Sequence, residues 1–145
     1  MDVEVDAVRE VDQELVDAFG VLLPQLSASA GPPDRAALER VVRSEANTVL
    51  TARLDGRIVG TLTLVLFPVA TGMRARIEDV VVDASARGRG IAAELTRHAL
   101  RLAEQAGART VDLTSRPDRA AANRLYERLG CRARNSTVYR FGSER

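Results

Sequence analysis

The sequence predicts a mixed α/β domain, spanning residues 1–145, in which helices cover a largely antiparallel sheet. Three observations lead to this prediction. The 145 residues are the usual size of one domain. Hydrophobic periodicity switches repeatedly between the alternation typical of strands and the three-to-four spacing typical of helices. Near the middle of the chain an apolar strand, a glycine-rich turn and a long helix pattern follow one another, as in a parallel crossover unit.

The first third of the chain is predicted to form one strand and two helices. Residues 3–8 alternate apolar and polar side chains, which indicates a half-buried strand. Asp12 precedes an apolar stripe at helical spacing, and Pro24 is expected to mark the end of that helix. The stretch 27–33 is rich in small residues and proline, which indicates a loop, and Asp34 is the expected start of a second helix.

Three extended segments are expected next, at residues 48–54, 57–69 and 76–83. The dipeptide Asp55-Gly56 favours a type I′ hairpin turn, because both central residues of that turn need positive φ. The first two strands should therefore be antiparallel. The end of the third segment is too apolar for an exposed sheet face, so this strand is predicted to be central and covered on both sides.

The last part of the chain is predicted to alternate helix and strand. Helical spacing runs from Ile91 to a stop at Gly107, and a second helix over 118–129 stops at Gly130. A short strand is expected between them, at 110–114, and an extended stretch is expected at 132–141. The predicted element order is β-α-α-β-β-β-α-β-α-β.

The composition argues against some classes of protein. The 21 basic and 20 acidic residues give a net charge of +1, whereas a dedicated nucleic-acid-binding domain carries a clear basic excess. No run approaches the 18 apolar residues of a membrane span. Cys131 is the only cysteine, so no intrachain disulfide can form, and the acidic start of the chain does not resemble a signal peptide. We therefore expect a cytoplasmic protein.

The turn between the third strand and the long helix is the most informative segment. It reads Arg-Gly-Arg-Gly-Ile-Ala over residues 87–92. A helix N-terminus presents unpaired N–H groups and a partial positive charge, which together favour a pyrophosphate. Gly88 and Gly90 allow positive φ and close approach of the backbone, and Arg87 and Arg89 can add charge-assisted hydrogen bonds.

Read alone, the same turn also fits a tight strand-to-helix connection with no ligand. It does not match a dinucleotide fingerprint, because Ala93 stands where the third glycine is needed. It does not match a P-loop either, because that motif needs a lysine and every basic residue of this chain is arginine. The absence of lysine is explained by a coding bias. It is also compatible with phosphate recognition, which suits the arginine fork.

Beyond the turn, the sequence resembles the GNAT superfamily of N-acetyltransferases. The family's cofactor motif, Gln/Arg-x-x-Gly-x-Gly/Ala, is matched by Arg87, Gly90 and Ala92. Residues 77–83 are similar to the family's central strand, and residues 122–130 are similar to its second conserved block. The element order also matches, so the resemblance covers essentially the whole chain and implies the GNAT fold.

The resemblance implies acetyl-CoA as the co-substrate. Its pyrophosphate would lie on the turn, with contacts from Arg87, Gly88, Arg89, Gly90, Ile91 and Ala92. Its pantetheine arm would pair like an added strand with the backbone of Val80, Val81 and Val82. No metal is expected.

The second conserved block implies two further roles. Asn123 would hydrogen-bond the arm, and Tyr126 would protonate the departing thiolate as a general acid. The two residues are three apart and so share one helical face. The alternatives are a helix-surface amide for Asn123 and a core aromatic for Tyr126.

The base that neutralises the attacking amine is less clearly marked. Glu78 is the leading candidate, acting directly or through water, although it could instead bind a cationic substrate or pair with an arginine. Asp79 should point to the opposite face of the strand, by period two, unless a bulge intervenes. His98 is expected to be structural or surface-exposed, and Cys131 to be a small buried hydrophobe.

The resemblance, carried by these residues, implies transfer of an acetyl group from acetyl-CoA to a primary amine, and direct attack in a ternary complex is the expected mechanism. The acceptor is a small-molecule or peptide amine, and its pocket should be shaped by residues 22–27, by the 67–76 connection and by the strand near Tyr139. An arginine-rich run over 116–134 is read as a solvated face or a contact to the 3′-phosphate. No nucleic-acid or membrane partner is expected, and a homodimer stays open. One rival function is a non-catalytic acyl-CoA-binding sensor or partner module. The other is a nucleic-acid-binding domain that uses the arginine-rich run, although the net charge of +1 argues against it.

Overall fold

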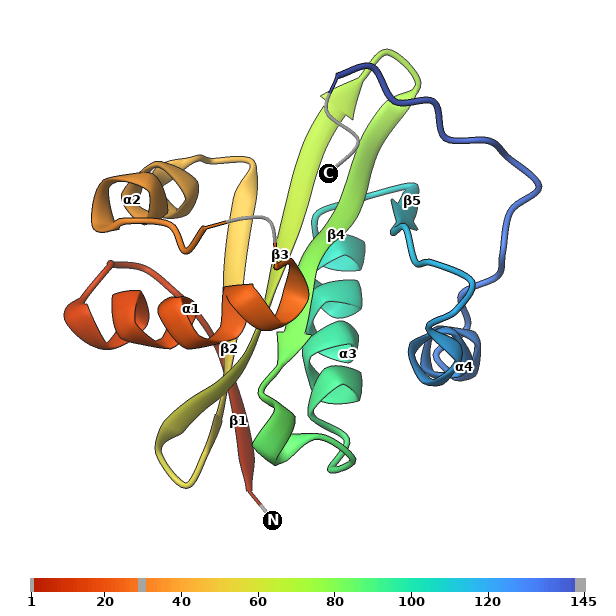
Figure 1. Ribbon diagram of the computed structural model, residues 1–145. Helices are drawn as coiled ribbons and strands as arrows, with labels where there is room; N and C mark the ends of the chain where they lie inside the picture. The colour runs from red at the N-terminus through yellow and green to blue at the C-terminus, as the bar shows by residue number, and fades with distance from the viewer. Residues whose placement is uncertain (1, 29–30, 143–145) are drawn as a thin grey trace. The chain divides into compact units, whose positions relative to one another are not determined.

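The computed structural model describes residues 2–28 and 31–142, and the chain divides into two compact units (Figure 1). Unit 1 is Met1–Leu113 and unit 2 is Thr114–Arg145. The predicted 27–33 loop includes residues 29 and 30, which lie outside the described residues. Across the described ranges, no helix combines the length and the apolar character that crossing a membrane requires.

Unit 1 contains a sheet of five strands, three α-helices and one 3-10 turn. The strands are β1 (Val3–Ala7), β2 (Asn47–Leu54), β3 (Arg57–Val69), β4 (Gly72–Val82) and β5 (Thr110–Asp112). The helices are α1 (Gln13–Leu26), α2 (Arg35–Arg43) and α3 (Ile91–Gln105), and the 3-10 turn η1 is Ala84–Ala86. Unit 2 contains the helix α4 (Ala120–Arg128).

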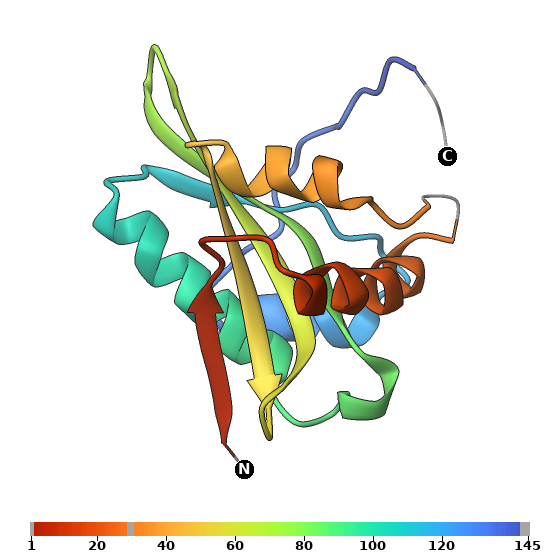
Figure 2. The ribbon, with the colours of Figure 1, turned by 90° about the vertical axis from the view of Figure 1, so that its left-hand side faces the viewer.

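The sheet is mixed, as predicted. Its strands lie in sequence order from β1 to β5, and every neighbouring pair is antiparallel except β4 and β5, which are parallel. Helix α3 connects these two parallel strands, which confirms the predicted crossover unit. Helices α1 and α2 cover one face of the sheet and α3 covers the other (Figures 1 and 2).

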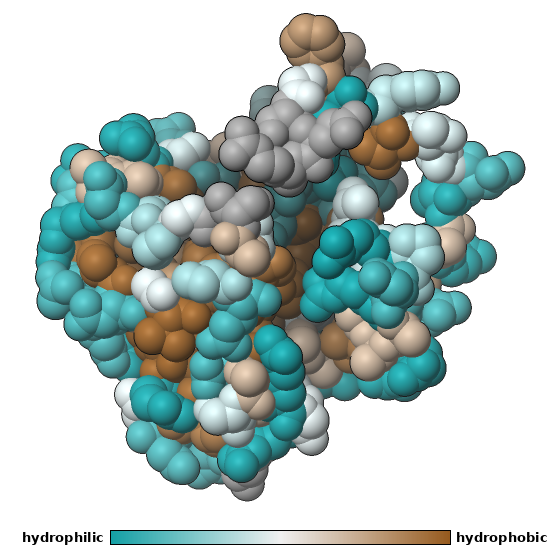
Figure 3. All heavy atoms as spheres, viewed as in Figure 1, coloured by the Kyte–Doolittle hydropathy of each residue, from teal (hydrophilic) through white to brown (hydrophobic). Residues whose placement is uncertain are grey.

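The core of unit 1 is aliphatic on both faces. On one face, Leu95 and Ala99 of α3 pack in a cluster with Leu62 and Leu64 of β3, and all four are fully buried. A smaller cluster joins α1 and α2 to the other face and includes Leu15, Phe19, Leu38 and Val49. Over α1 and α2, on the left of Figure 3, hydrophobic side chains remain visible between hydrophilic ones. Burial of these clusters is the main force holding the helices to the sheet.

The predicted helix starts and the predicted hairpin are confirmed. The Asp12 carboxylate accepts a hydrogen bond from the Leu15 N–H at 2.9 Å, and Asp34 caps α2 in the same way. Asp55 and Gly56 have φ values of 52° and 80°, as a type I′ turn requires.

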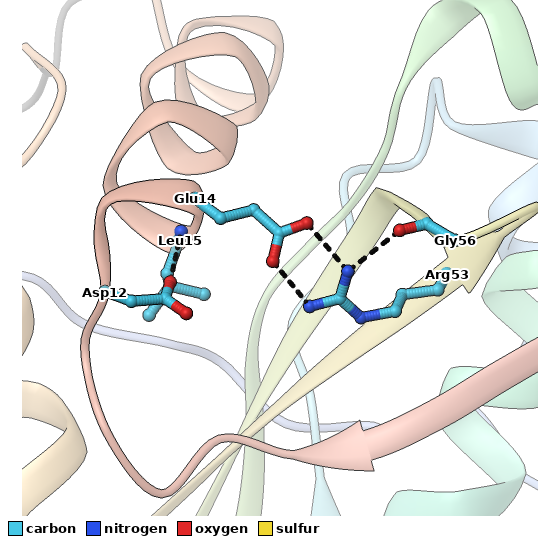
Figure 4. Close-up of polar contacts among 5 residues, drawn as sticks. All are labelled: Asp12, Glu14, Leu15, Arg53 and Gly56. Atoms are coloured by element: carbon cyan, nitrogen blue, oxygen red, sulfur yellow. Dashed lines mark hydrogen bonds and ion pairs between the residues drawn. The ribbon is translucent and has the colours of Figure 1, made fainter.

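An ion pair fastens the start of α1 to the same hairpin (Figure 4). Both carboxylate oxygens of Glu14 accept from the Arg53 guanidinium, at 2.7 and 2.8 Å. One nitrogen of this guanidinium also donates to the Gly56 carbonyl at 2.9 Å. The guanidinium lowers the pKa of Glu14, mainly through its hydrogen bond, so the pair stays charged in neutral solution.

Two predicted boundaries were wrong. Helix α1 continues past Pro24 to Leu26. A proline ring removes only one main-chain bond near a helix end, and the Gln25 side chain donates to the Val21 carbonyl there at 3.1 Å. Strand β4 begins at Gly72 rather than at residue 76, because its hairpin with β3 pairs from Val69 and Gly72 onward.

The predicted last strand is also absent from the described residues. Residues 132–141 are exposed and have no ladder partner. A strand exists only where its N–H and C=O groups pair with a neighbour, so an apolar extended sequence is not sufficient. Strand β5 is shorter than predicted for the same reason, since its pairing with β4 ends at Asp112.

Candidate functional site

The two halves of β4 have different neighbours. From Gly72 to Arg76 the strand lies between β3 and β5, and the last pair with β5 joins Arg76 to Asp112. From Ile77 to Val82 it pairs only with β3 among the residues of unit 1 that the structure describes. Main-chain groups on this open edge need another partner, which an extended ligand can supply.

A β-bulge interrupts the open half of β4. Thr63 pairs with Glu78 and Thr61 pairs with Val81, so two residues of β4 lie opposite one residue of β3. The first of the two, Asp79, has φ of 53°, which is uncommon for a residue other than glycine. A bulge re-aims the side chains around it. Glu78 and Asp79 are accordingly both exposed, so the bulge that the sequence left open is present.

The two acidic side chains at the bulge have different electrostatic surroundings. The Glu78 carboxylate accepts from Nε of Arg76 at 3.0 Å, so the predicted alternative of an arginine pair is realised. Asp79 is exposed by its surface area, yet its carboxyl group is partly desolvated. This desolvation raises the pKa of Asp79, and repulsion from Glu78 adds to the shift.

The turn that follows β4 has the predicted geometry. Gly88 and Gly90 have φ values of 79° and 77°, which are accessible to glycine and strained for other residues. Helix α3 begins at Ile91 with no side-chain cap, and its first internal bond runs from the Glu94 N–H to the Gly90 carbonyl at 3.1 Å. The N–H groups before Glu94 therefore have no partner within the helix, which makes this end of α3 suitable for an anion.

Two arginines flank the glycines of this turn. Nε of Arg87 donates to the Val82 carbonyl at 3.1 Å, which holds the side chain against the end of β4. Arg89 is exposed. Both guanidinium groups are at the surface and can contact a bound phosphate.

The turn is also fastened to α1, through a contact that no sequence motif indicated. Oε1 of Gln25 accepts from the Ala84 N–H at 2.9 Å, and its Nε2 donates to the Asp83 carboxylate at 2.8 Å. Asp83 in turn accepts from the main-chain N–H and the hydroxyl of Ser85. These hydrogen bonds lower the pKa of Asp83, with the Ser85 side chain as the largest cause and Gln25 as the second.

The remaining predicted residues lie in unit 2. Asn123 binds the segment that precedes α4: its Oδ1 accepts from the Ser115 hydroxyl at 2.6 Å, and its Nδ2 donates to the Arg116 carbonyl at 3.2 Å. Tyr126 is half-buried on the same helix. Burial raises the pKa of Tyr126, against the opposing effect of Arg119, so its phenol keeps its proton at neutral pH.

Two other candidates have properties that fit structural roles. The His98 ring lies on α3 with its Nδ1 3.1 Å from the Arg101 guanidinium. Cys131 is half-buried, and burial raises the pKa of its thiol, which disfavours the nucleophilic thiolate. Among the described residues, no three His, Cys, Asp or Glu side chains cluster closely enough to hold a metal ion.

Unit 1 also has an open groove of about 540 Å³ between α1, the start of β3 and the end of β4. Its lining is partly apolar, with Val21, Leu22 and Ile58, and partly charged, with Asp17 and Asp83. The groove does not include Glu78, Asp79 or the three valines. The candidate site is therefore identified by the edge of β4 that lacks a second strand partner within the described part of unit 1, and not by this groove.

Comparison with known proteins identifies the family. The family model for the acetyltransferase (GNAT) family matches residues 9–131, most of the chain. No curated protein shows significant sequence similarity. Among solved structures, a putative acetyltransferase from Agrobacterium tumefaciens is 25% identical with a TM-score of 0.83, and covers 97% of this chain and 99% of its own.

Two further solved structures are similar over the same length. A transcriptional regulator from Bacillus halodurans is 26% identical with a TM-score of 0.80, and covers 97% of this chain and 100% of its own. A ribosomal-protein-alanine N-acetyltransferase from Brucella melitensis is 26% identical with a TM-score of 0.76, with the same coverage of 97% and 100%. The open edge of β4, the uncapped start of α3 and these matches agree, and the chain belongs to the GNAT family as an acetyl-CoA-dependent acetyltransferase.

Proposed function

We propose that this protein transfers the acetyl group of acetyl-CoA to a primary amine. The observation that carries the proposal is the continuity of two features in unit 1. The edge of β4 from Ile77 to Val82 has no strand partner besides β3 in the described part of unit 1, and it leads through two glycines with positive φ into the uncapped N-terminus of α3. An extended amide-bearing arm joined to a pyrophosphate matches these two features in the same order.

The cofactor contacts follow from that match. Main-chain groups of Val80, Val81 and Val82 would pair with the pantetheine arm. The turn would hold the pyrophosphate through Arg87, Gly88, Arg89, Gly90, Ile91 and Ala92. Asn123 is proposed as an additional contact to the arm, in exchange for one of its bonds within unit 2. The family model spans residues of both units, which supports one catalytic domain over the whole chain.

The proposed chemistry is a direct attack in a ternary complex. Glu78, directly or through a water molecule, accepts a proton from the acceptor ammonium, because only the neutral amine is nucleophilic. The amine nitrogen forms a bond to the thioester carbonyl carbon, and the carbon–sulfur bond then breaks. Tyr126 donates its phenolic proton to the departing thiolate, and its raised pKa keeps that proton available. The nitrogen releases its extra proton to solvent as the amide forms, and solvent returns a proton to the Tyr126 phenolate.

The proposal leaves the chemical class of the acceptor amine to be tested. The similarity to a ribosomal-protein-alanine N-acetyltransferase supports the N-terminal amine of a peptide as one class to test. The second candidate function is a module that binds an acyl-CoA without turnover. The proposal includes a cytoplasmic location, which the single cysteine supports.

The test is release of the CoA thiol from acetyl-CoA against a panel of amino acids, polyamines, aminoglycosides and peptide N-termini. We expect at least one amine to stimulate release. Tyr126→Phe should then lower kcat by about 100-fold, since general-acid catalysis contributes about that much, while the acetyl-CoA affinity stays within twofold. Glu127→Gln is the control, because Glu127 is exposed on the same helix and has no proposed role.

The possible outcomes separate the two candidate functions. Tight binding of acetyl-CoA with no thiol release for any amine supports a module that binds an acyl-CoA without catalysis. Absence of acetyl-CoA binding contradicts both. An unchanged kcat for Tyr126→Phe, when chemistry limits the rate, removes Tyr126 as the acid.

A further inference from the structure

Gln25 is the residue of α1 that reaches the connection between β4 and α3. Its side-chain amide uses both ends there, with Oε1 on the Ala84 N–H and Nε2 on the Asp83 carboxylate. The contact joins residues 58 and 59 positions apart in the sequence. No periodicity or motif in the sequence predicts such a contact, so only the structure reveals it.

The residues that Gln25 holds are the first two after β4. Asp83 is itself tied to β3, because its N–H donates to the Val59 carbonyl at 2.8 Å. Its carboxylate caps η1 through Ser85, and the Ala86 N–H donates to the Asp83 carbonyl at 2.9 Å. The connection continues directly into the turn of Gly88 and Gly90. Gln25 therefore fixes the point from which the pyrophosphate turn departs.

We infer that Gln25 is a positioning residue, which couples the end of α1 to the proposed pyrophosphate turn and so sets the affinity for acetyl-CoA. The inference rests on the proposed function of that turn. A turn held in its binding conformation before the ligand arrives loses less conformational entropy on binding. Without Gln25, residues 83 and 84 would keep only their bonds to β3 and within η1, and ligand binding would have to supply the remaining order.

The same contact connects the segment that we expect to border the acceptor pocket with the turn that we propose to bind the cofactor. Gln25 lies in the last turn of α1, within the segment 22–27 that we expect to border the acceptor pocket. Movement of this segment on acceptor binding would be transmitted to Asp83 and Ala84 through two hydrogen bonds. Binding of one substrate should therefore alter the affinity for the other, and by linkage the effect is reciprocal.

The test compares two glutamines of the same helix. Gln25→Met keeps the length of the side chain and removes its hydrogen bonds to the turn. Gln13→Met is the matched control, because Gln13 also bonds through both ends of its amide, to Asp17 and Arg35, at the far end of α1. Calorimetry with acetyl-CoA gives Kd, and steady-state kinetics give KM and kcat.

We expect Gln25→Met to raise Kd and KM for acetyl-CoA by about 3- to 10-fold, the loss that one or two exposed hydrogen bonds account for. Saturating acetyl-CoA should restore kcat. Gln13→Met should leave Kd within twofold of wild type. In a double-mutant cycle, Gln25→Met should have a smaller effect in an Asp83→Ala background, because the two residues act together.

Three outcomes overturn the inference. Equal affinity of wild type and Gln25→Met shows that Gln25 does not position the turn, and equal loss in both glutamine variants shows a general destabilisation. Fully additive effects in the cycle show that Gln25 does not act with Asp83. Failure of the wild-type protein to bind acetyl-CoA is a different result, because it contradicts the proposed function itself.

Discussion

The two halves of β4 differ in their partners, although both belong to one continuous strand. The first half, from Gly72 to Arg76, pairs with β3 throughout and with β5 at residues 74–76. The half from Ile77 to Val82 pairs with β3 alone in the described part of unit 1. The bulge and the acidic pair belong to the second half, which also leads into the glycine turn before α3. The first half serves to build the sheet, and the second half contains the strand residues of the proposed site.

This difference shows that a site need not be a deep pocket. The groove between α1 and β3 has a volume of about 540 Å³, yet none of the predicted catalytic or cofactor-binding residues lines it. An unpaired strand edge is a stronger signal, because its N–H and C=O groups are spaced for an extended chain of amides. The distinction between the two halves can be tested by substitutions in or next to the open half.

The largest effect is expected at the turn that follows the open half. Gly90→Val should weaken acetyl-CoA binding by about 30-fold or more, because a β-branched residue at φ of 77° strains the turn by about 1–3 kcal/mol and projects atoms toward the ligand. Calorimetry measures the loss. Gly107→Val is the control, since Gly107 has φ of 79° and equally open surroundings but lies at the other end of α3. Similar affinities for the two variants would contradict the placement of the pyrophosphate.

A smaller effect is expected within the open half, at Glu78. Glu78→Gln should lower kcat by about 10-fold or more at neutral pH if its carboxylate takes the proton of the amine. Glu94→Gln is the matched control, because Glu94 is similarly exposed and pairs with Arg97 at 2.8 Å on α3. Initial rates over a range of pH separate a base from a binding group. A change in KM for the acceptor with kcat unchanged would assign Glu78 to binding instead.

The smallest effect is expected at Asp79, and it concerns stability. Because the pKa of Asp79 is raised in the folded state, the folded protein binds more protons just above the ordinary pKa of aspartate, so the free energy of unfolding falls as pH rises through that range. Asp79→Asn removes this penalty and tolerates positive φ. The gain at pH 7 should be at most about 0.5 kcal/mol, because the side chain is exposed, and should raise Tm by about 1–2 °C.

Thermal unfolding at two pH values checks this last prediction. The difference in Tm between Asp79→Asn and wild type should disappear in acid, where Asp79 is protonated in both the folded and the unfolded state. Asp112→Asn, on the neighbouring strand, serves as the control for removing an exposed charge. A lower Tm for Asp79→Asn at neutral pH would show that the carboxylate stabilises the bulge.

Much of the fold could be predicted from local physics. The caps at Asp12 and Asp34, the hairpin at Asp55 and the stop at Gly107 depend on one or two neighbouring residues, and all four are confirmed. Pro24 led to a wrong helix boundary, because a proline in the last turn of a helix removes only one main-chain hydrogen bond. The stretch 132–141 misled it because a strand depends on a partner that the sequence pattern does not name.

Some features of the candidate site could likewise be predicted from the sequence, and others could not. The geometry of the glycine turn at residues 87–92 was predictable, because glycine spacing and the start of a helix are local features. The bulge at Asp79 was left open, because it depends on the register between β3 and β4. The link from Gln25 to Asp83 could not be predicted, because it joins distant segments through exposed polar groups.

The open edge of β4 also affects how the protein behaves at high concentration. A half-paired strand rich in valine is a template for edge-to-edge association with another chain. A bulge and adjacent carboxylates, as at Glu78 and Asp79, are features that oppose such pairing, because they distort the edge and repel an incoming copy. A ligand that occupies the edge should suppress association further, so the protein should stay monodisperse to higher concentration when acetyl-CoA is present during purification.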